Sequence, residues 1–392
     1  MPVEFTGSGD SMALEPIHIG FIGGGPRGNS VYETLVFQRR FEGQIHPTCI
    51  VDRSPGVLKK WRYKVDFPCK SLDEMLKNEF IDAVVIVTPP STHAKCAKAC
   101  LEAGIYAWSE VPMGLSLEEL WAIRDAARAN KGTGGTYALG ENYCWHLGNQ
   151  FALKLVKDGA MGDIFYMEGV YHHSLEHYMI VENFKHGKQV DPAKDLGTTP
   201  TWRATLAPIT YGHAIGPCLH VLEAQRTDRP VQVSAFGNMK MLARFNTQNF
   251  QLGLCRTAND VICKFGSGFV LPNHGFTRHA FWGTRCLFEA PATHDGRYYL
   301  YKVPPDQFTY PARHQQEGVY LDDGDLREMG IVHATGGHGG SDTLMFQAWI
   351  DGIRGKDPYP IDAVKGAEMT ACGICGARSI DLGRTINIPD FR

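Results

Sequence analysis

The chain has 392 residues, 43% of them hydrophobic and 21% charged, a globular composition with room for two domains of about 100–200 residues each. Its 39 Lys and Arg residues face 42 Asp and Glu residues, and the net charge of -3 argues against nucleic acid as the main partner. The apolar runs are far shorter than the roughly 20 residues of a membrane helix, and residues 1–16 lack the features of a secretory signal. The 11 cysteines are scattered and odd in number, unlike a disulfide scaffold. We therefore predict a cytoplasmic protein with a flexible tail at residues 1–15 and no membrane partner.

Strands and helices alternate through the first third of the chain. Short apolar, β-rich runs occupy residues 18–23, 48–52, 83–88, 106–110 and 136–139. Between them, Ser71 with Glu74 and Ser116 with Glu119 have the S-x-x-E spacing of a capping box, which predicts two helix starts. Strand–helix alternation at this spacing predicts a parallel sheet with helices on both faces.

The first predicted turn carries a signal for a dinucleotide. Residues 23–28 read Gly-Gly-Gly-Pro-Arg-Gly, a G-x-G-x-x-G match between an apolar run and a helix. Such glycines allow a tight turn and the close approach of a pyrophosphate, which the helix N-terminus favours. Asp52 ends the second run near the usual position of a ribose-binding acid, and its charge favours NAD by repelling a 2′-phosphate. Arg53 beside it leaves NADP open, and a plain glycine-rich turn is the structural alternative.

The second half of the chain has a different pattern. A helix is predicted at residues 149–157, and residues 164–173 alternate like a half-buried strand. Further strand candidates lie at residues 231–236, 261–265 and 280–289. Strands separated by turn residues predict a mostly antiparallel sheet.

These patterns divide the chain into two domains. Residues 16–140 are predicted to form an NAD-binding α/β domain on a parallel sheet, and residues 141–392 an α+β domain on a large, mostly antiparallel open sheet. Within the second domain we expect a mobile loop at residues 183–200. We also expect a helix after the glycine-rich segment 336–340, with Ser341 or Asp342 as its cap.

The second half of the chain is rich in histidine, a common metal ligand. The histidines include His172, His173, His177, His213, His220, His333 and His338. No H-E-x-x-H motif and no matching pair of C-x-x-C motifs accompanies them, so we predict no metal site. Cys372 and Cys375 form one C-x-x-C within a helical run, which favours two thiols on a helix face over a redox motif.

The sequence resembles the Gfo/Idh/MocA oxidoreductases, which include glucose-fructose oxidoreductase and inositol dehydrogenase. The resemblance is carried by the loop at 23–28, by Thr-Pro-Pro-Ser-Thr-His at 88–93 and by Glu-Val-Pro at 110–112. It implies a Rossmann domain followed by an open, mostly antiparallel sheet domain. Where the family normally has Glu-Lys-Pro, with a Lys that moves the proton of the substrate hydroxyl, this chain has Val111. Valine holds no proton, which argues against a sugar dehydrogenase of the usual design.

One branch of the family is more similar: the NAD-dependent glycosidases of glycoside hydrolase family 109 and their relatives, which also carry Glu-Val-Pro. Further segments agree in order and rough spacing, at residues 141–143, 168–171, 202–203, 211–217 and 337–342. The branch tends to have Tyr-Pro-Thr-His where this chain has Thr210-Tyr211-Gly212-His213. That difference concerns the sugar more than the chemistry.

The resemblance implies hydrolysis of a glycoside by transient oxidation of sugar C3, loss of the C2 proton, elimination, addition of water and re-reduction. No convincing pair of carboxylates supports an ordinary glycosidase mechanism instead. The implied proton-transfer residues are Tyr171 and His213, supported by Glu141, and a nearby positive charge would lower the pKa of Tyr171 toward use. The implied cofactor-binding residues are Gly23, Gly25, Pro26, Arg27, Gly28, Asp52, Arg53, Thr88, Pro90, Ser91, Thr92, His93, Glu110, Val111 and Asn142. The implied substrate-binding residues are Trp202, Arg203, Thr210 and Tyr211, for an N-acetylgalactosaminide-like or sulfoquinovoside-like sugar.

Each role has a structural alternative. Tyr171 could be a packing aromatic of a strand, His213 a hydrogen-bonded loop residue and Arg203 a surface cation. The alternative functions are an NAD(P)-dependent sugar dehydrogenase, in which Tyr171 or His213 replaces the missing Lys, and a non-catalytic sugar or nucleotide sensor. By analogy with the family, the open sheet face predicts a homodimer or homotetramer.

Overall fold

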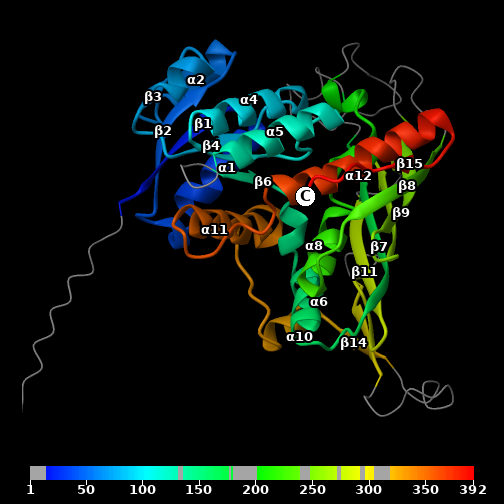
Figure 1. Cartoon of the computed structure of the whole chain (residues 1–392). Helices are drawn as coiled ribbons and strands as arrows, with labels where there is room; N and C mark the ends of the chain where they lie inside the picture. The colour runs from blue at the N-terminus through cyan, green and yellow to red at the C-terminus, as the bar shows by residue number, and fades with distance from the viewer. Residues whose placement is uncertain are drawn as a thin grey trace, which may run out of the picture.

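A computed structural model describes residues 15–130, 136–175, 178–179, 201–238, 248–271, 275–291, 296–303 and 318–392. The predicted mobile loop at 183–200 and, apart from Glu15, the predicted tail at 1–15 lie outside the described residues. The chain forms two sheets, and helices that lie between them pack against both (Figure 1).

The first sheet is entirely parallel and has six strands in the order β3-β2-β1-β4-β5-β6. Its strands are β1 (Ile17–Ile22), β2 (Ile45–Val51), β3 (Phe67–Pro68), β4 (Ala83–Ile86), β5 (Tyr106–Ser109) and β6 (Tyr137–Leu139). The helices that follow them are α1 (Pro26–Phe37), α2 (Pro55–Trp61), α3 (Leu72–Leu76), α4 (His93–Glu102) and α5 (Leu117–Ala129). The strands read as continuous apolar runs because helices cover both faces of a parallel sheet. This confirms the predicted α/β arrangement, and only the two-residue β3 was not predicted.

The two predicted capping boxes form in part. Ser71 and Ser116 accept hydrogen bonds from the backbone N–H groups of Glu74 and Glu119, as predicted, and begin α3 and α5. The Glu74 and Glu119 carboxylates, however, accept from the N–H groups one residue before each cap, at Lys70 and Leu115. One orphan donor is therefore satisfied inside each helix and another just outside it.

The second sheet has nine strands in the order β14-β13-β12-β11-β7-β10-β9-β8-β15, all antiparallel except for the pair β7 and β10. Its strands are β7 (Ile164–His173), β8 (Pro230–Gly237), β9 (Phe250–Thr257), β10 (Ile262–Gly268), β11 (Gly275–Gly283), β12 (Cys286–Glu289), β13 (Tyr298–Lys302), β14 (Val319–Leu321) and β15 (Ile386–Asn387). The mostly antiparallel sheet is confirmed, and β7 has the predicted bounds. The predicted strand at 280–289 is instead the end of β11, a turn and β12.

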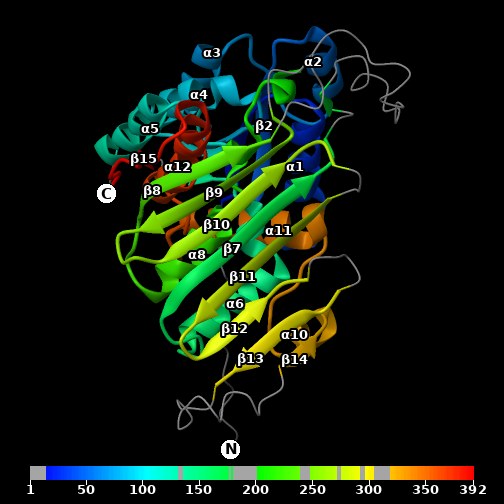
Figure 2. The ribbon, with the colours of Figure 1, turned by 90° about the vertical axis from the view of Figure 1, so that its right-hand side faces the viewer.

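Helices cover one face of this second sheet. Behind it in Figure 2 lie α6 (Leu147–Lys157) and α8 (Gly216–Gln225), while the face toward the viewer carries no helix of the described residues. After the sheet, the chain forms α10 (Asp323–Glu328), which packs near β14, and η7 (Gly337–Gly340), which packs against α1 and leads into α11 (Ser341–Ile353).

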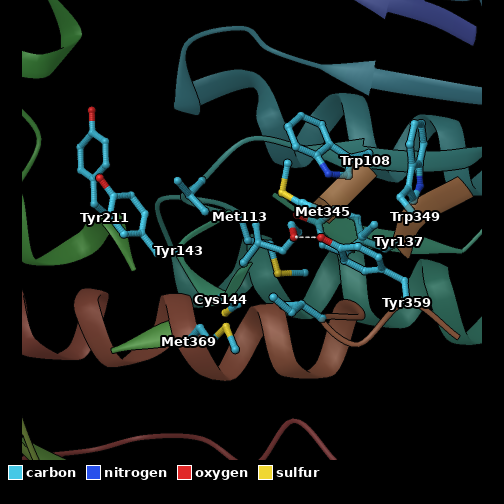
Figure 3. Packing of buried hydrophobic residues seen from close by; sticks show 14 of the residues in the cluster. Trp108, Met113, Tyr137, Tyr143, Cys144, Tyr211, Met345, Trp349, Tyr359 and Met369 are labelled. Carbon is cyan, nitrogen blue, oxygen red and sulfur yellow. Dashed lines mark hydrogen bonds between the residues drawn. The ribbon is translucent and has the colours of Figure 1, made fainter. Parts of the chain in front are cut away.

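The last helices return to the first sheet. Phe346 of α11 packs on Trp108 of β5, with ring centroids 4.9 Å apart. The Tyr359 hydroxyl donates to the Leu139 carbonyl over 2.8 Å, ahead of α12 (Ala363–Leu382). Figure 3 shows the resulting cluster, which includes Trp108 of the first sheet and Trp349 of α11; the Phe346 ring centroid lies 6.1 Å from that of Trp349. The two sheets therefore share one continuous hydrophobic core.

The cysteines lie inside this structure. All eleven are buried and none is in a disulfide bond. Cys372 and Cys375 lie on α12, as the sequence predicted. Among the described residues, no helix is both long enough and apolar enough to cross a membrane.

Candidate active site at the edge of the first sheet

The glycine loop after β1 has the geometry that a dinucleotide requires. Gly23 has a φ of +96°, and a Cβ on Gly28 would lie 2.2 Å from the Gly23 carbonyl oxygen, so both positions require glycine. Among the described residues, a Cβ on Gly25 would meet nothing within 4 Å and no side chain caps α1, so the first N–H groups of the helix have no side-chain partner there. Asp52 accepts from the backbone N–H of Gly24 over 2.9 Å, which holds its carboxylate beside the loop. This loop can hold a pyrophosphate on the helix N-terminus with an acid at its flank.

Arg27 of this loop is held by two carboxylates. Its Nε donates to Glu110 over 2.5 Å, and its two terminal nitrogens donate to Asp342 over 2.6 and 3.3 Å. Asp342 also accepts from Asn142 over 2.8 Å and from His338 over 3.0 Å. Burial would raise the pKa of Asp342, but the His338 hydrogen bond and the Arg27 charge outweigh it and hold that pKa well below its usual range.

The prediction that Ser341 or Asp342 caps the helix after the glycine segment is wrong. The N-cap of α11 is Gly340, whose left-handed φ of +93° a glycine adopts without strain. Asp342 is the second residue of α11, and its side chain reaches across to Arg27 of α1. The local sequence pattern suggested a cap because it cannot show a partner on another element.

The segments after β4 and β5 are tied together by His93. Its ring lies between two carbonyl oxygens, those of Pro112 and Thr88, each 2.8 Å away. Burial lowers the pKa of His93, although hydrogen bonds to the two carbonyls act in the opposite direction. Thr92 donates to the Thr88 hydroxyl over 2.7 Å, and Val111 is buried. His93 therefore fixes the two predicted cofactor segments relative to each other at the carboxyl ends of their strands.

A buried carboxylate–histidine pair follows β6. Glu141 is fully buried, and its Oε1 lies 2.7 Å from Nδ1 of His213. Its second oxygen, Oε2, is buried and has no hydrogen-bond partner among the residues that the structure describes. An ionised carboxylate only accepts hydrogen bonds, so His213 donates from Nδ1 and Nε2 of the neutral ring keeps its lone pair. The pair can therefore accept a proton at Nε2.

Tyr171 lies against this pair. Its ring centroid is 4.6 Å from that of His213 and 6.1 Å from that of Tyr211. Two residues earlier on β7, a Cβ on Gly169 would come within 1.7 Å of the Ala214 carbonyl oxygen, so only glycine lets the strand approach the His213 turn. Burial raises the pKa of Tyr171 well above its usual value, and Arg203 opposes this only in part. The hypothesis of a lowered pKa is not met here, because desolvation outweighs the positive charge.

The predicted sugar residues gather on two short helices, η5 (Trp202–Ala204) and η6 (Pro208–Tyr211). Trp202 and Tyr211 stack with an interplanar angle of 17°, and the Arg203 guanidinium lies 4.2 Å from the Trp202 ring centroid. Burial raises the pKa of Tyr211 to about 12. The Thr210 hydroxyl donates to the Ala207 carbonyl over 2.6 Å, so that hydrogen bond is made within the turn. The result is an aromatic wall with one cation on it, next to Tyr171.

The other predicted cofactor residues differ in exposure. Pro90 is buried, whereas Pro26, Arg53 and Ser91 are exposed. Among the described residues, no group of three or more His, Cys, Asp and Glu side chains is arranged to hold a metal ion. The assignment of individual residues to cofactor and sugar stays a prediction.

Sequence reasoning missed two positioning residues. His279 on β11 donates from Nε2 to the His213 carbonyl over 3.0 Å, and its Nδ1 lies 3.1 Å from the Asn149 amide nitrogen. Burial lowers the pKa of His279 to about 4. The predicted strand began at residue 280, one position too late to show that a histidine points inward. Asp342 was missed as a site residue because it was assigned to a helix cap.

Comparison with known proteins agrees with these observations. Residues 17–136 match the Gfo/Idh/MocA family model, described as an oxidoreductase family with an NAD-binding Rossmann fold. A glycosyl hydrolase family 109 protein from Stenotrophomonas maltophilia is 24% identical over 416 residues, covering 96% of this chain and 89% of that protein. An alpha-N-acetylgalactosaminidase from Tannerella forsythia is 24% identical over 353 residues, covering 82% of this chain and 73% of that protein. Levoglucosan dehydrogenase in complex with NADH and L-sorbose has a similar fold, with a TM-score of 0.74 at 16% identity over 96% of this chain and 99% of that one. The family resemblance, the fold class and NAD as the cofactor are thereby confirmed.

Proposed function

We propose that this chain, which carries an N-terminal domain of the Gfo/Idh/MocA oxidoreductase family, is an NAD-dependent glycoside hydrolase. The observation that carries the proposal is the buried Glu141–His213 pair against Tyr171, in a site where Val111 replaces the family's lysine. Two proton-handling groups suit a reaction with proton transfers at two neighbouring sugar carbons. The similarity to family 109 proteins supports the same reading.

The residues around the glycine loop fit NAD. Gly25 leaves space before α1, Asp52 stands beside the loop, and Asn142 offers a buried oxygen that lacks a partner among the described residues. When bound, NAD supplies an acceptor for a hydride from sugar C3 and returns that hydride at the end of the cycle. Glu110 and Asp342 neutralise Arg27, which leaves the helix N-terminus as the main attraction for the phosphates.

The side chains beyond this edge would handle protons. His213 accepts the C2 proton at Nε2, because Glu141 holds its Nδ1 as a donor and stabilises the imidazolium that forms. Tyr171 keeps its proton near pH 7, the more so because its pKa is raised, so it would act as a relay: as the C3 hydroxyl proton moves onto the Tyr171 oxygen, the phenol's own proton would pass to water. A ketone at C3 makes the C2 proton acidic enough for a histidine to remove it.

The aromatic wall would orient the sugar. Trp202 and Tyr211 present apolar faces, and Arg203 carries donors for a hydroxyl, an acetamido oxygen or an anionic substituent. We propose an N-acetylgalactosaminide-like or sulfoquinovoside-like substrate.

The test is one reaction of protein, NAD and a panel of α- and β-glycosides in heavy water. We expect release of the aglycone, deuterium at C2 of the product and no net formation of NADH. Steady formation of NADH without release of the aglycone would identify a sugar dehydrogenase instead. NAD binding without any turnover across the panel would favour the sensor.

We also propose that two copies assemble through the open face of the second sheet. Phe236, Leu254 and Ile262 are exposed there on the adjacent strands β8, β9 and β10, and Trp282 is exposed on β11, on the other side of β7. Exposed apolar side chains gathered on one face favour an interface. Light scattering should give a dimer or tetramer, and Leu254→Glu should shift it toward the monomer; a wild-type monomer at micromolar concentration would refute this.

A further inference from the structure

Asp342 is a fully buried carboxylate that receives hydrogen bonds from three parts of the molecule. Arg27 comes from α1, Asn142 from η3 (Asn142–Trp145) and His338 from η7. Each carboxylate oxygen accepts two of the four bonds, at 2.6 and 3.0 Å for Oδ2 and at 2.8 and 3.3 Å for Oδ1. No acceptor capacity is left over, so the carboxylate is fixed in place.

This arrangement dictates how the Asn142 amide is turned. An ionised carboxylate cannot donate, so the amide must direct its nitrogen toward Asp342 and its oxygen away. That oxygen is buried and lacks a partner among the described residues. A buried acceptor without a donor costs free energy, which a ligand's donor would recover.

We propose that Asp342 is a positioning residue for cofactor recognition: it fixes the Asn142 amide so that its oxygen accepts a hydrogen bond from the carboxamide NH2 of nicotinamide. The inference rests on the cofactor of the proposed function, and it does not depend on glycoside cleavage. Its place in the site supports it. Asn142 follows Glu141 directly, at the carboxyl end of β6, whereas Asp52 marks the adenosine side of the loop. The reacting end of the cofactor must lie near the sugar and hence near the Glu141–His213 pair.

The experiment compares two cofactors by equilibrium binding, with no turnover involved. One is NAD, and the other is nicotinic acid adenine dinucleotide, which has a carboxylate in place of the carboxamide and therefore no NH2. We expect the wild-type protein to bind NAD at least about tenfold more tightly, because the analogue would place a carboxylate against the amide oxygen. Equal affinities for the two would overturn the proposal.

Asp342→Asn then tests the role of the carboxylate. An amide at 342 can donate as well as accept, so Asn142 is free to turn its NH2 toward the ligand, and the preference for NAD should shrink to about threefold or less. A preference unchanged from the wild type would overturn the proposal. Asp228→Asn is the matched control, since Asp228 is another buried carboxylate with several donors but lies in the turn before β8, and this variant should keep the full preference.

Asn142→Ala keeps the test decisive if Asp342→Asn does not fold. It removes the proposed acceptor and leaves Asp342 bound to Arg27 and His338. The preference for NAD should shrink here too, while a full preference in this variant would show that Asn142 does not meet the carboxamide. If cofactor discrimination behaves as expected and no glycoside is cleaved, only the hydrolase proposal fails.

Discussion

The two buried carboxylates of the site, Glu141 and Asp342, are both fully enclosed, yet their surroundings differ. Asp342 accepts four hydrogen bonds from three groups and carries a pKa held well below its usual range. Glu141 has one partner, His213, and its second oxygen has none among the described residues. A carboxylate with every lone pair engaged fixes its neighbours, whereas one with capacity to spare can respond to a charge that appears during a reaction. The number of donors thus separates a positioning residue from one that takes part in proton transfer.

The largest effect is expected for Glu141→Gln, which tests whether Glu141 takes part in proton transfer. The new amide can donate to Nδ1 of His213, which places the proton on Nε2 and removes the base. We expect kcat for release of the aglycone to fall about 10²–10⁴-fold. NAD affinity, measured by equilibrium binding, should stay within about threefold of the wild type. Asp342→Asn should do the opposite: it should change the preference between the two cofactors and lower kcat less than Glu141→Gln does. Loss of NAD affinity in Glu141→Gln, with kcat retained, would contradict the division of roles.

Gly169→Ala tests whether the reactive pair depends on the close approach of β7. The added methyl would lie 1.7 Å from the Ala214 carbonyl oxygen, so strand and turn must separate. We expect the free energy of unfolding, from urea titration, to fall by about 1–3 kcal/mol, together with a loss of activity. Gly56→Ala is the control: it lies in α2, where a Cβ would meet only the Ser54 hydroxyl at 3.7 Å. Wild-type stability for Gly169→Ala would show that the turn moves away without cost.

His279, which donates a hydrogen bond to the His213 carbonyl, should make the stability of the protein depend on pH. Burial lowers the pKa of His279 from 6.5 to about 4 in the folded protein, so the unfolded chain binds more protons between these values. Stability from this group is therefore present above pH 6.5 and is lost as the pH falls, by about 2 kcal/mol at pH 5. His279→Gln cannot titrate, and its free energy of unfolding should decline less steeply from pH 7 to pH 5. Parallel curves for the two proteins would refute this assignment.

The smallest expected effect concerns the aromatic wall formed by Trp202 and Tyr211. Arg203→Lys keeps the positive charge but loses the planar stacking on Trp202, so we expect KM to rise about three- to tenfold with little change in kcat. Arg256→Lys is the control, because Arg256 lies at the end of β9 and donates hydrogen bonds to Asp260 and Gln232, none of which is in the site. An equal effect of both substitutions, or a loss confined to kcat, would remove Arg203 from substrate binding.

Local sequence patterns predicted most of the fold. Apolar runs and capping serines placed five of the six parallel strands and two helix starts, because these signals lie within a few residues of each other. In the second sheet, β9, β13, β14 and β15 were not predicted; of these, β14 and β15 are short edge strands that depend on pairing with a neighbour.

The site was predicted less evenly, and distance along the chain explains why. Glu141 and His213 lie 72 residues apart, and the family resemblance, rather than any local pattern, brought them together. Arg27 and Asp342 lie 315 residues apart, and neither the pattern nor the resemblance assigned Asp342 to the cofactor. A hydrogen bond between distant elements leaves no trace in the residues around either partner.

The contact between Arg27 and Asp342 also sets an order for folding. The glycine loop is made early in synthesis, but Asp342, the second carboxylate that binds its arginine, arrives 315 residues later, on α11. Contacts of such sequence separation form late, because a long loop must close before they add stability. Until α11 docks, the nascent first sheet therefore holds Arg27 through Glu110 alone, and the Asn142 amide has no carboxylate to fix its direction.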